Sequence, residues 1–364
     1  MAKSVAHTAE FAQIYKKSTQ TGQSAPRGRA IFSQALKETV GRRELFGMRI
    51  EFSGVIVLLL GILAMTGCVT PFHPGAPKGA IDVIAHRGAS AYAPENTLAA
   101  FALAKEMGAD WFELDCTLSK DGHVVVIHDD TLDRTTNGEG PVRDHTLAEL
   151  KQLDAGAWKD SQYAGERLPL LSEALELARE RRIGVYIEIK NAQDDSRLMA
   201  DIVHMAGERT RMTPEMKRSM HRMIVESGTR NLELTRKVVA IVREHRMARQ
   251  VVIQSFSPIV CAIARHEAPR IRVEMLALKD KDNPQRWPLY LKWRNWLDVA
   301  GFNSNLDSLD EAGVRQCRAE GRAVAIWTVD DPDVMRRIAG WNINRIITNK
   351  PDICLQTLRE IGKR

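Results

Sequence analysis

The chain has 364 residues, 44% of them apolar, which is enough for one large domain with a buried core and additional segments. Its formal charge of +6 comes mainly from residues 1–67, which hold nine basic and four acidic residues and leave 43 basic and 42 acidic residues from Cys68 onward. Because the main body is nearly neutral, nucleic acid is not among the expected partners.

Residues 1–67 read as a leader. Gly54–Gly67 is an uncharged apolar run, too short for a membrane span of about 20 residues but typical of a signal peptide. It follows Met48 and ends directly before Cys68, in a pattern similar to a bacterial lipoprotein signal. We therefore predict a signal peptide over 48–67 and a lipid on Cys68. The alternative is an uncleaved anchor whose basic segment 27–49 stays in the cytoplasm. Either reading predicts an exported body tethered to a membrane.

Residues 68–80 are rich in Pro and Gly and predict a tether, and residues 81–364 predict the catalytic domain. Eight apolar, β-rich runs follow in order: Ile81–Ala85, Trp111–Cys116, Val124–Ile127, Val185–Ile189, Val251–Gln254, Ile271–Leu276, Ala323–Trp327 and Arg345–Thr348. Helical patterns lie between them: Thr97–Met107, Ser172–Arg182, Leu232–His245, Leu309–Glu320 and Asp331–Ala339. This alternation predicts an α/β fold with a parallel sheet, most simply a (β/α)8 TIM barrel. A doubly wound open sheet is the alternative, but no GxGxxG follows the first strand.

The domain is longer than the about 250 residues of a plain barrel. The surplus lies in a long, polar segment rich in Met and Arg after the fourth run, and we predict a helical insertion over about 192–245 there. It either restricts the substrate or only elaborates the surface.

Acidic residues occupy one face of two predicted strands. Side chains alternate along a strand, so Glu113 and Asp115 share one face, and Glu188 shares a face with Lys190. The acids would project into the barrel near its carboxyl end, where barrel active sites lie. Converging carboxylates need a compensating charge, and their oxygens suit one divalent ion, Mg²⁺ or Ca²⁺. The alternative is that each acid pairs with a neighbouring Arg or Lys.

Histidines follow two of the runs. His86 follows the first and His128 the third, which makes a general acid and base pair plausible at the same rim. Arg87 offers a fork of donors suited to phosphate oxygens, and Lys190 adds a point charge. Together with the acids, these groups predict phosphoryl chemistry.

Short motifs occur along the chain in this order: His86-Arg87-Gly88, Pro94-Glu95-Asn96-Thr97, Glu113-Leu114-Asp115, Asp121-Gly122, Val124–Asp129, Glu188-Ile189-Lys190, Gln254-Ser255-Phe256 and Trp327-Thr328-Val329. In their combination and order the sequence resembles the glycerophosphodiester phosphodiesterase family. The resemblance implies a (β/α)8 barrel in which Glu113, Asp115 and Glu188 hold the metal. It also implies that His86 and His128 exchange protons with the nucleophile and the leaving group.

The resemblance implies further roles in substrate binding. Arg87 and Lys190 would contact the phosphate, and Glu95 and Asn96 would shape the rim, although Asn96 could instead be only a helix N-cap. Trp327 would line the pocket, with plain core packing as its alternative.

Some positions depart from the family pattern or stand outside it. Cys116 is expected to face outward, and both Cys116 and Cys261 are predicted to be buried free thiols. Asp330 stands where an asparagine is common. Asp280–Trp296 is basic and aromatic, and it suits a solvated helix and loop better than a lipid contact.

The expected reaction is metal-dependent hydrolysis of glycerophosphodiesters to glycerol 3-phosphate and an alcohol. One alternative is a lysophospholipase D or phospholipase-like enzyme that uses the same site on lipids. A second is a non-catalytic surface binding protein, which retention of both histidines and all three acids argues against.

Overall fold

The computed structural model describes residues 79–364, so the predicted leader, the lipidation at Cys68 and most of the tether lie outside the described residues. Within the described part, eight parallel strands form the barrel: β1 (Asp82–Ala85), β2 (Trp111–Leu118), β4 (Gly184–Ile189), β5 (Val251–Ser255), β6 (Arg272–Ala277), β7 (Gly301–Asn305), β8 (Ala325–Trp327) and β9 (Arg345–Thr348). Since β1 pairs with both β2 and β9, the sheet closes on itself. The predicted (β/α)8 barrel is confirmed.

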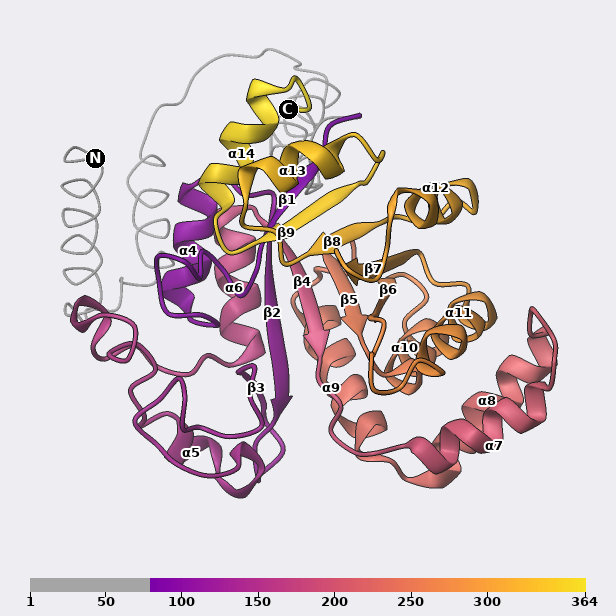
Figure 1. Ribbon diagram of the computed structural model, residues 1–364. Coiled ribbons are helices and arrows are strands. Elements are labelled where there is room, and N and C mark those ends of the chain that lie inside the picture. Colours follow the sequence, from indigo (N-terminus) through magenta and orange to yellow (C-terminus); the bar gives the residue numbers. More distant parts are fainter. Residues whose placement is uncertain (1–78) are drawn as a thin grey trace, which may run out of the picture. The chain divides into compact units, whose positions relative to one another are not determined.

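Helices surround the barrel (Figure 1). They are α4 (Leu98–Glu106), α6 (Leu171–Arg181), α9 (Arg230–Glu244), α10 (Pro258–Glu267), α11 (Arg286–Leu297), α12 (Glu311–Ala319), α13 (Pro332–Ala339) and α14 (Pro351–Glu360). Local sequence sets where several of them begin. Ser257 and Asp331 accept backbone N–H bonds as N-caps, and each is followed by a proline, whose missing N–H costs nothing in the first turn.

The run Val124–Ile127 is not a barrel strand, and this prediction was wrong. It forms β3 (Val124–Val126), which pairs antiparallel with β2 through Cys116↔Val126 and Leu118↔Val124. The turn 119–123 is too short for a parallel crossover, which needs about a dozen residues. β3 therefore extends β2 as a hairpin outside the barrel.

The strand that the apolar pattern missed is β7. It begins with Gly301, where a Cβ would lie 2.6 Å from the Glu274 side chain, so only glycine fits without displacing that residue. Asn303 and Ser304 are fully buried, and they donate to Glu274 (2.9 Å) and to the Ala277 carbonyl (2.7 Å). Hydrogen bonds replace apolar contacts along this strand, so it carries no apolar run.

Glu274 and Arg345 form a buried ion pair. The Glu274 side chain is 0% exposed and accepts from Arg345 Nη1 at 3.0 Å. Burial opposes the charge on Arg345, but Tyr186, Glu274 and Asp82 outweigh it and raise the pKa of Arg345. The guanidinium also lies 5.6 Å from the centre of the Tyr186 ring.

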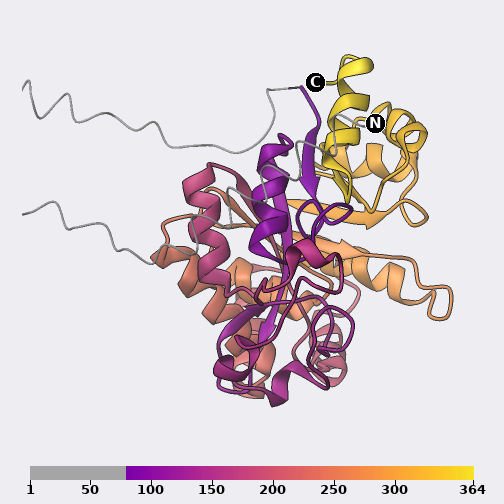
Figure 2. The ribbon, with the colours of Figure 1, turned by 90° about the vertical axis from the view of Figure 1, so that its left-hand side faces the viewer.

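The segment after β4 contains two helices outside the ring, α7 (Ser196–Ala206) and α8 (Pro214–Ser227). The helix that follows them, α9, packs against α6 and α10 as part of the ring. Figure 1 shows α7 and α8 at the end of the barrel to which the β2 and β4 arrows point. The segment with α5 (Leu147–Leu150) lies at the same end of the barrel, on the opposite side. Figure 2, turned by 90°, also shows this segment at that end.

The basic and aromatic stretch 280–296 ends in α11. Trp293 and Trp296 are fully buried, and Trp296 Nε1 donates to the Arg209 carbonyl at 2.8 Å. Residues 280–285 before the helix are mostly exposed. The two tryptophans thus pack in the core instead of facing a lipid surface.

The cysteines of the described part are buried and free, as predicted for Cys116 and Cys261. Cys116 lies in the layer between strands and helices, so it faces outward from the barrel interior as expected. No helix between residues 79 and 364 is long and apolar enough to cross a membrane.

Candidate active site

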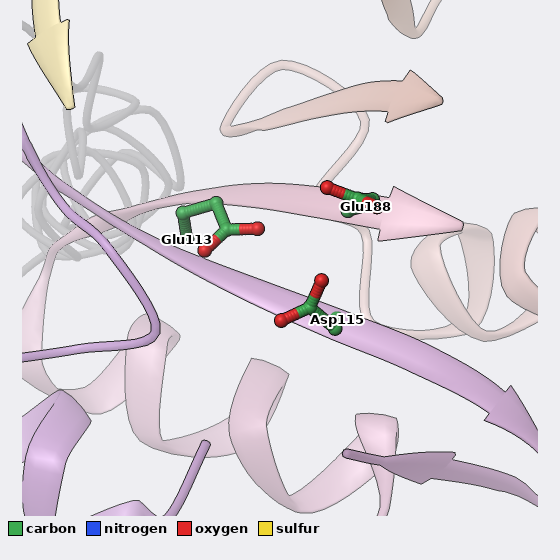
Figure 3. Close-up of side chains that lie close together, drawn as sticks. All are labelled: Glu113, Asp115 and Glu188. Atoms are coloured by element: carbon green, nitrogen blue, oxygen red, sulfur yellow. The ribbon is translucent and has the colours of Figure 1, made fainter. Parts of the chain in front are cut away.

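Three acids meet at the carboxyl end of β2 and β4. The two strands pair in the register Asp115↔Glu188, which sets Glu113, Asp115 and Glu188 on the same side of the sheet. One carboxylate oxygen of each lies within 4.8 Å of the others, and all three residues are buried. Figure 3 shows Glu113 and Asp115 on one strand, with Glu188 on the next.

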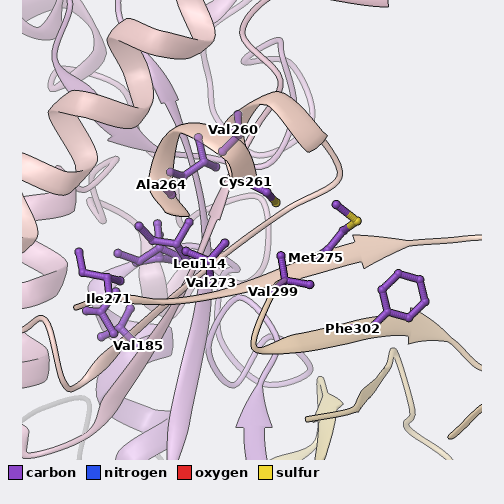
Figure 4. Close-up of a cluster of buried hydrophobic side chains, with 14 of the residues drawn as sticks. Leu114, Val185, Val260, Cys261, Ala264, Ile271, Val273, Met275, Val299 and Phe302 are labelled. Atoms are coloured by element: carbon purple, nitrogen blue, oxygen red, sulfur yellow. The ribbon is translucent and has the colours of Figure 1, made fainter. Parts of the chain in front are cut away.

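The alternate residues of the same strands face the helices. Leu114 and Val185 lie in an apolar cluster with Val273 of β6 and with Val260 and Ala264 of α10 (Figure 4). Burial of these side chains fixes the register, because a slip by one residue would turn the acids into the helix layer.

Repulsion between the three carboxylates makes it harder for all of them to ionise together. Burial, together with Asp115 and Glu188, raises the pKa of Glu113 well above its usual value. Burial and Asp115 raise the pKa of Glu188 to about 7. Burial also opposes ionisation of Asp115, but Lys190 and Arg87 outweigh it and lower the pKa of Asp115. Three carboxylates thus face two cations, and a divalent ion would let all three ionise. Their hard oxygen donors fit such an ion.

The two cations contact the acids directly. Lys190 Nζ lies 3.1 Å from Glu188 and 3.6 Å from Asp115. Arg87 donates from its backbone to Glu113 (2.9 Å). Its Nε lies 3.4 Å from Asp115, is buried, and has no hydrogen-bond partner among residues 79–364. An oxygen ligand in the site would satisfy this donor.

Glu95 holds Arg87 in place together with a residue that the sequence did not single out. Its carboxylate accepts from Arg87 (2.8 Å) and from both terminal nitrogens of Arg134 (2.9 Å each). Burial opposes its ionisation, but hydrogen bonds from Arg134 and Arg87 outweigh this and lower the pKa of Glu95 to about 2. Arg134 lies in a loop with no periodic pattern, so only its basic side chain near the His128-Asp129 motif could have pointed to it.

Asn96 is not the N-cap of α4, because Thr97 holds that position. The Asn96 amide donates to the Asp115 carboxylate at 3.0 Å and accepts from the Asp115 backbone at 3.1 Å. Asn96 therefore orients Asp115.

His86 is oriented by a chain of hydrogen bonds from the last strand of the barrel. Its Nδ1 lies 2.8 Å from Asn349 Oδ1, and Ser90 Oγ lies 2.7 Å from the same oxygen. Asn349 donates through Nδ2 to Asp330 at 2.6 Å. A carboxylate only accepts, so Asn349 Oδ1 must face His86 as an acceptor. His86 then carries its proton on Nδ1 and keeps the lone pair of Nε2 free.

The surroundings also keep His86 neutral. Loss of hydration and the charge of Arg87 lower the pKa of His86 to about 4, although the hydrogen bond to Asn349 works in the opposite direction. Asp330, at the position where the family pattern commonly has an asparagine, accepts three hydrogen bonds from Thr348 and Asn349. Asp330 therefore orients Asn349, which in turn orients His86.

His128 comes to the same rim by a different route from the one predicted. It follows the antiparallel β3, where the Ile127 N–H donates to the Asp115 carbonyl at 3.0 Å. Its Nδ1 lies 2.6 Å from Asp129. A hydrogen bond from Arg134 lowers the pKa of Asp129, and His128 adds to this effect. Asp129 is thus ionised beside the His128 ring.

Trp327 ends β8 and is half-buried. Its ring meets Phe256 edge to face at 5.6 Å and packs on the cluster inside the barrel. Its Nε1 is buried without a hydrogen-bond partner within residues 79–364. Packing is therefore one role of Trp327, and a free donor remains for a ligand.

Replacing Asn349 by alanine is expected to lower kcat by roughly 10–100-fold with little change in KM, because His86 loses the acceptor that fixes its tautomer. The double change Asp330→Asn with Asn349→Asp swaps the carboxylate and the amide between the two positions. It keeps an oxygen acceptor opposite Nδ1 of His86. It should recover most of kcat. Steady-state kinetics and melting temperatures of both variants check this. Equal loss in both, with unchanged stability, would show that the acceptor is unimportant.

Comparisons with known proteins agree on one family. Residues 86–353 match the model of the "Glycerophosphoryl diester phosphodiesterase family". A glycerophosphodiester phosphodiesterase of Caldanaerobacter subterraneus subsp. tengcongensis is 34% identical over 280 residues, covering 77% of this chain and 98% of the relative. One from Bacillus subtilis is 31% identical over 313 residues, covering 82% and 94%.

Solved structures show the same relationship. An Oleispira antarctica phosphodiesterase in complex with the product sn-glycerol-3-phosphate has a TM-score of 0.60 and 27% identity, covering 77% of this chain and 97% of that one. A glycerophosphodiester phosphodiesterase from Agrobacterium tumefaciens has a TM-score of 0.54 and 30% identity, covering 76% and 99%. The match runs from the end of β1 to the start of α14 and includes all the site residues described above from His86 to Asn349, and the chain belongs to the glycerophosphoryl diester phosphodiesterase family.

Proposed function

We propose that this phosphoric diester hydrolase cleaves glycerophosphodiesters to glycerol 3-phosphate and an alcohol, with a divalent metal ion and two histidines. One observation supports this most: three buried acids, two histidines and Arg87 share a single barrel mouth. The product bound to the Oleispira antarctica relative supports a glycerol phosphate unit in the substrate.

Glu113, Asp115 and Glu188 would hold the ion, either Mg²⁺ or Ca²⁺. A bound divalent ion supplies positive charge that polarises a phosphoryl oxygen and offsets developing negative charge. Arg87 contributes to the phosphate its buried Nε, which has no hydrogen-bond partner within residues 79–364, and Lys190 adds a second positive charge while keeping Asp115 and Glu188 in place.

The two histidines divide the proton transfers. His86 has a free Nε2 lone pair and takes the proton of the attacking hydroxyl, which belongs to water or to the glycerol. If the glycerol hydroxyl attacks, the cyclic phosphate that forms is opened by water in a second step to give glycerol 3-phosphate. His128, beside the ionised Asp129, donates a proton to the departing alcohol oxygen. The phosphorus–oxygen bond to the alcohol breaks as the new one forms.

Chelation is expected to abolish turnover of glycerophosphocholine, and added Mg²⁺ or Ca²⁺ is expected to restore it, because the three acids repel one another without the ion. Release of choline measured before and after dialysis against a chelator checks this. The control is the circular dichroism spectrum, which should stay that of a folded barrel. Full activity of metal-free protein would contradict the assignment of the acids.

The same assay separates the lipid-directed alternative. Lysophosphatidylcholine should be a much poorer substrate than glycerophosphocholine, since Trp293 and Trp296 of α11 are packed in the core and do not face a lipid. Preference for the lysophospholipid would favour a lysophospholipase D. Binding without turnover of either would favour a surface binding protein.

We also propose that the enzyme is exported and tethered to a membrane, through a lipid on Cys68 or an uncleaved anchor. The apolar run before Cys68 supports this. Mass spectrometry of the mature N-terminus should find a lipid-modified Cys68 or an anchor retained in the membrane fraction. An unmodified chain free of the membrane would contradict both forms.

A further inference from the structure

A cavity of about 280 Å³ adjoins the site. Thr117, Asp130 and Asn191 are among the residues that line it. Thr117 and Asp130 stand two positions after Asp115 and His128, and Asn191 directly follows the site lysine. A strand advances about 3.3 Å per residue, so the cavity wall at Thr117 begins about 7 Å beyond Asp115. Thr117 lies at the end of β2 and Asn191 just after β4, so the cavity continues the barrel mouth on the side where these two strands end.

Two arginines give this cavity an excess of positive charge. Arg143 and Arg230 line it and are exposed. Neither guanidinium has a hydrogen bond or an ion pair to any residue within 79–364, whereas Arg87 and Arg134 are both held by carboxylates. The acid among the lining residues is Asp130. Two unpaired guanidinium forks beside one carboxylate suit an anionic ligand that also carries hydroxyl groups.

The position of the cavity indicates which part of a substrate would reach it. In the proposed function the phosphodiester binds at the acids and Arg87, so a cavity beyond His128 lies where the departing alcohol would extend. Its volume is close to the lower limit of ordinary ligand pockets, about 300 Å³, which fits a small polar group and not an acyl chain.

We propose that this cavity, named here the arginine pocket, binds the alcohol half of the substrate and selects alcohols that carry a second phosphate group. The inference rests on the proposed glycerophosphodiester hydrolysis and names its substrate class. Arg143 and Arg230 would bind the second phosphate, and Asp130 would accept from hydroxyl groups of the alcohol. Arg230 is the first residue of α9, so this helix of the ring, and not α7 or α8, would take part in substrate selection.

Two matched substrates test the proposal. In glycerophosphoglycerol the departing alcohol is uncharged glycerol. In bis(glycerophospho)glycerol the departing alcohol carries a second, negatively charged phosphate. We expect kcat/KM to be about tenfold higher for the second substrate, because charge-assisted hydrogen bonds to arginine are strong. The preference should shrink as salt is raised, since both arginines are exposed.

Variants assign the effect to the pocket. Arg143→Gln and Arg230→Gln should each reduce the preference, and the double variant should lose it while hydrolysing glycerophosphoglycerol at the normal rate. Arg359→Gln is the matched control, because Arg359 is exposed in the last turn of α14, and the helices of the barrel end away from the mouth. This variant should keep the full preference.

Equal kcat/KM for the two substrates in the unaltered enzyme would overturn the inference and leave the proposed function standing. So would a preference that survives in the double variant. Failure to hydrolyse either substrate with Mg²⁺ or Ca²⁺ present would remove the proposed function and this inference with it.

Discussion

Alanine at His86 or at His128 is expected to lower kcat for glycerophosphocholine by about 10²–10⁴-fold, the usual contribution of a general acid or base. The physical reason is that each ring is held with one nitrogen engaged and the other free for the substrate. His86 is fixed by Asn349, and His128 by Asp129. Steady-state kinetics at saturating metal measure the loss, and the melting temperature should change little because both rings lie at the rim.

The two variants should differ on a substrate with a better leaving group. Glycerophospho-p-nitrophenol releases p-nitrophenolate, which needs no proton, so His128→Ala should regain much of its activity on it. His86→Ala should not, because the attacking hydroxyl still has to lose its proton. Recovery in His86→Ala instead would reverse the two assignments. Near-normal rates in either variant on glycerophosphocholine would refute the catalytic pair.

Replacing Glu274 by alanine is expected to destabilise the barrel by about 3 kcal/mol, because Arg345 would lose the nearer of its two carboxylate partners and keep only Asp82, at 3.3 Å. Asn303 would lose the nearer of its two acceptors at the same time and keep Gln254. Chemical denaturation measures the free energy of unfolding. The double variant Glu274→Ala with Arg345→Met removes both charges and should lose less stability than Glu274→Ala alone. A double variant at least as unstable as the single one would contradict this account.

The sequence predicted most of the barrel because apolar strands alternate with helices along the chain. It failed where that pattern breaks. β7 is a barrel strand with a single large apolar residue, Phe302, and hydrogen bonds from Asn303 and Ser304 to Glu274 and Ala277 replace apolar contacts elsewhere in it. β3 is apolar but antiparallel, and the short turn before it was the available signal.

The site residues on strands could also be predicted from the sequence, and those in loops could not. Strand parity placed Glu113, Asp115 and Glu188 together correctly, because β2 and β4 are neighbours in the barrel. Arg134 and Asn349 were not singled out, because they lie in loops and reach the site through contacts distant in sequence. Local pattern gives no information about such contacts.

The hydrogen bond between His86 and Asn349 joins residues 263 positions apart, across the seam where β1 meets β9. During synthesis, β1 leaves the ribosome long before β9 does, and until then His86 has no acceptor for Nδ1. Both histidines, Arg87, Arg134 and the three acids that would hold the metal are already present in a nascent chain that ends after β4. Asn349 and the closure of the barrel both depend on the final strand, so we expect the enzyme to acquire its full activity as one of the last events of its folding.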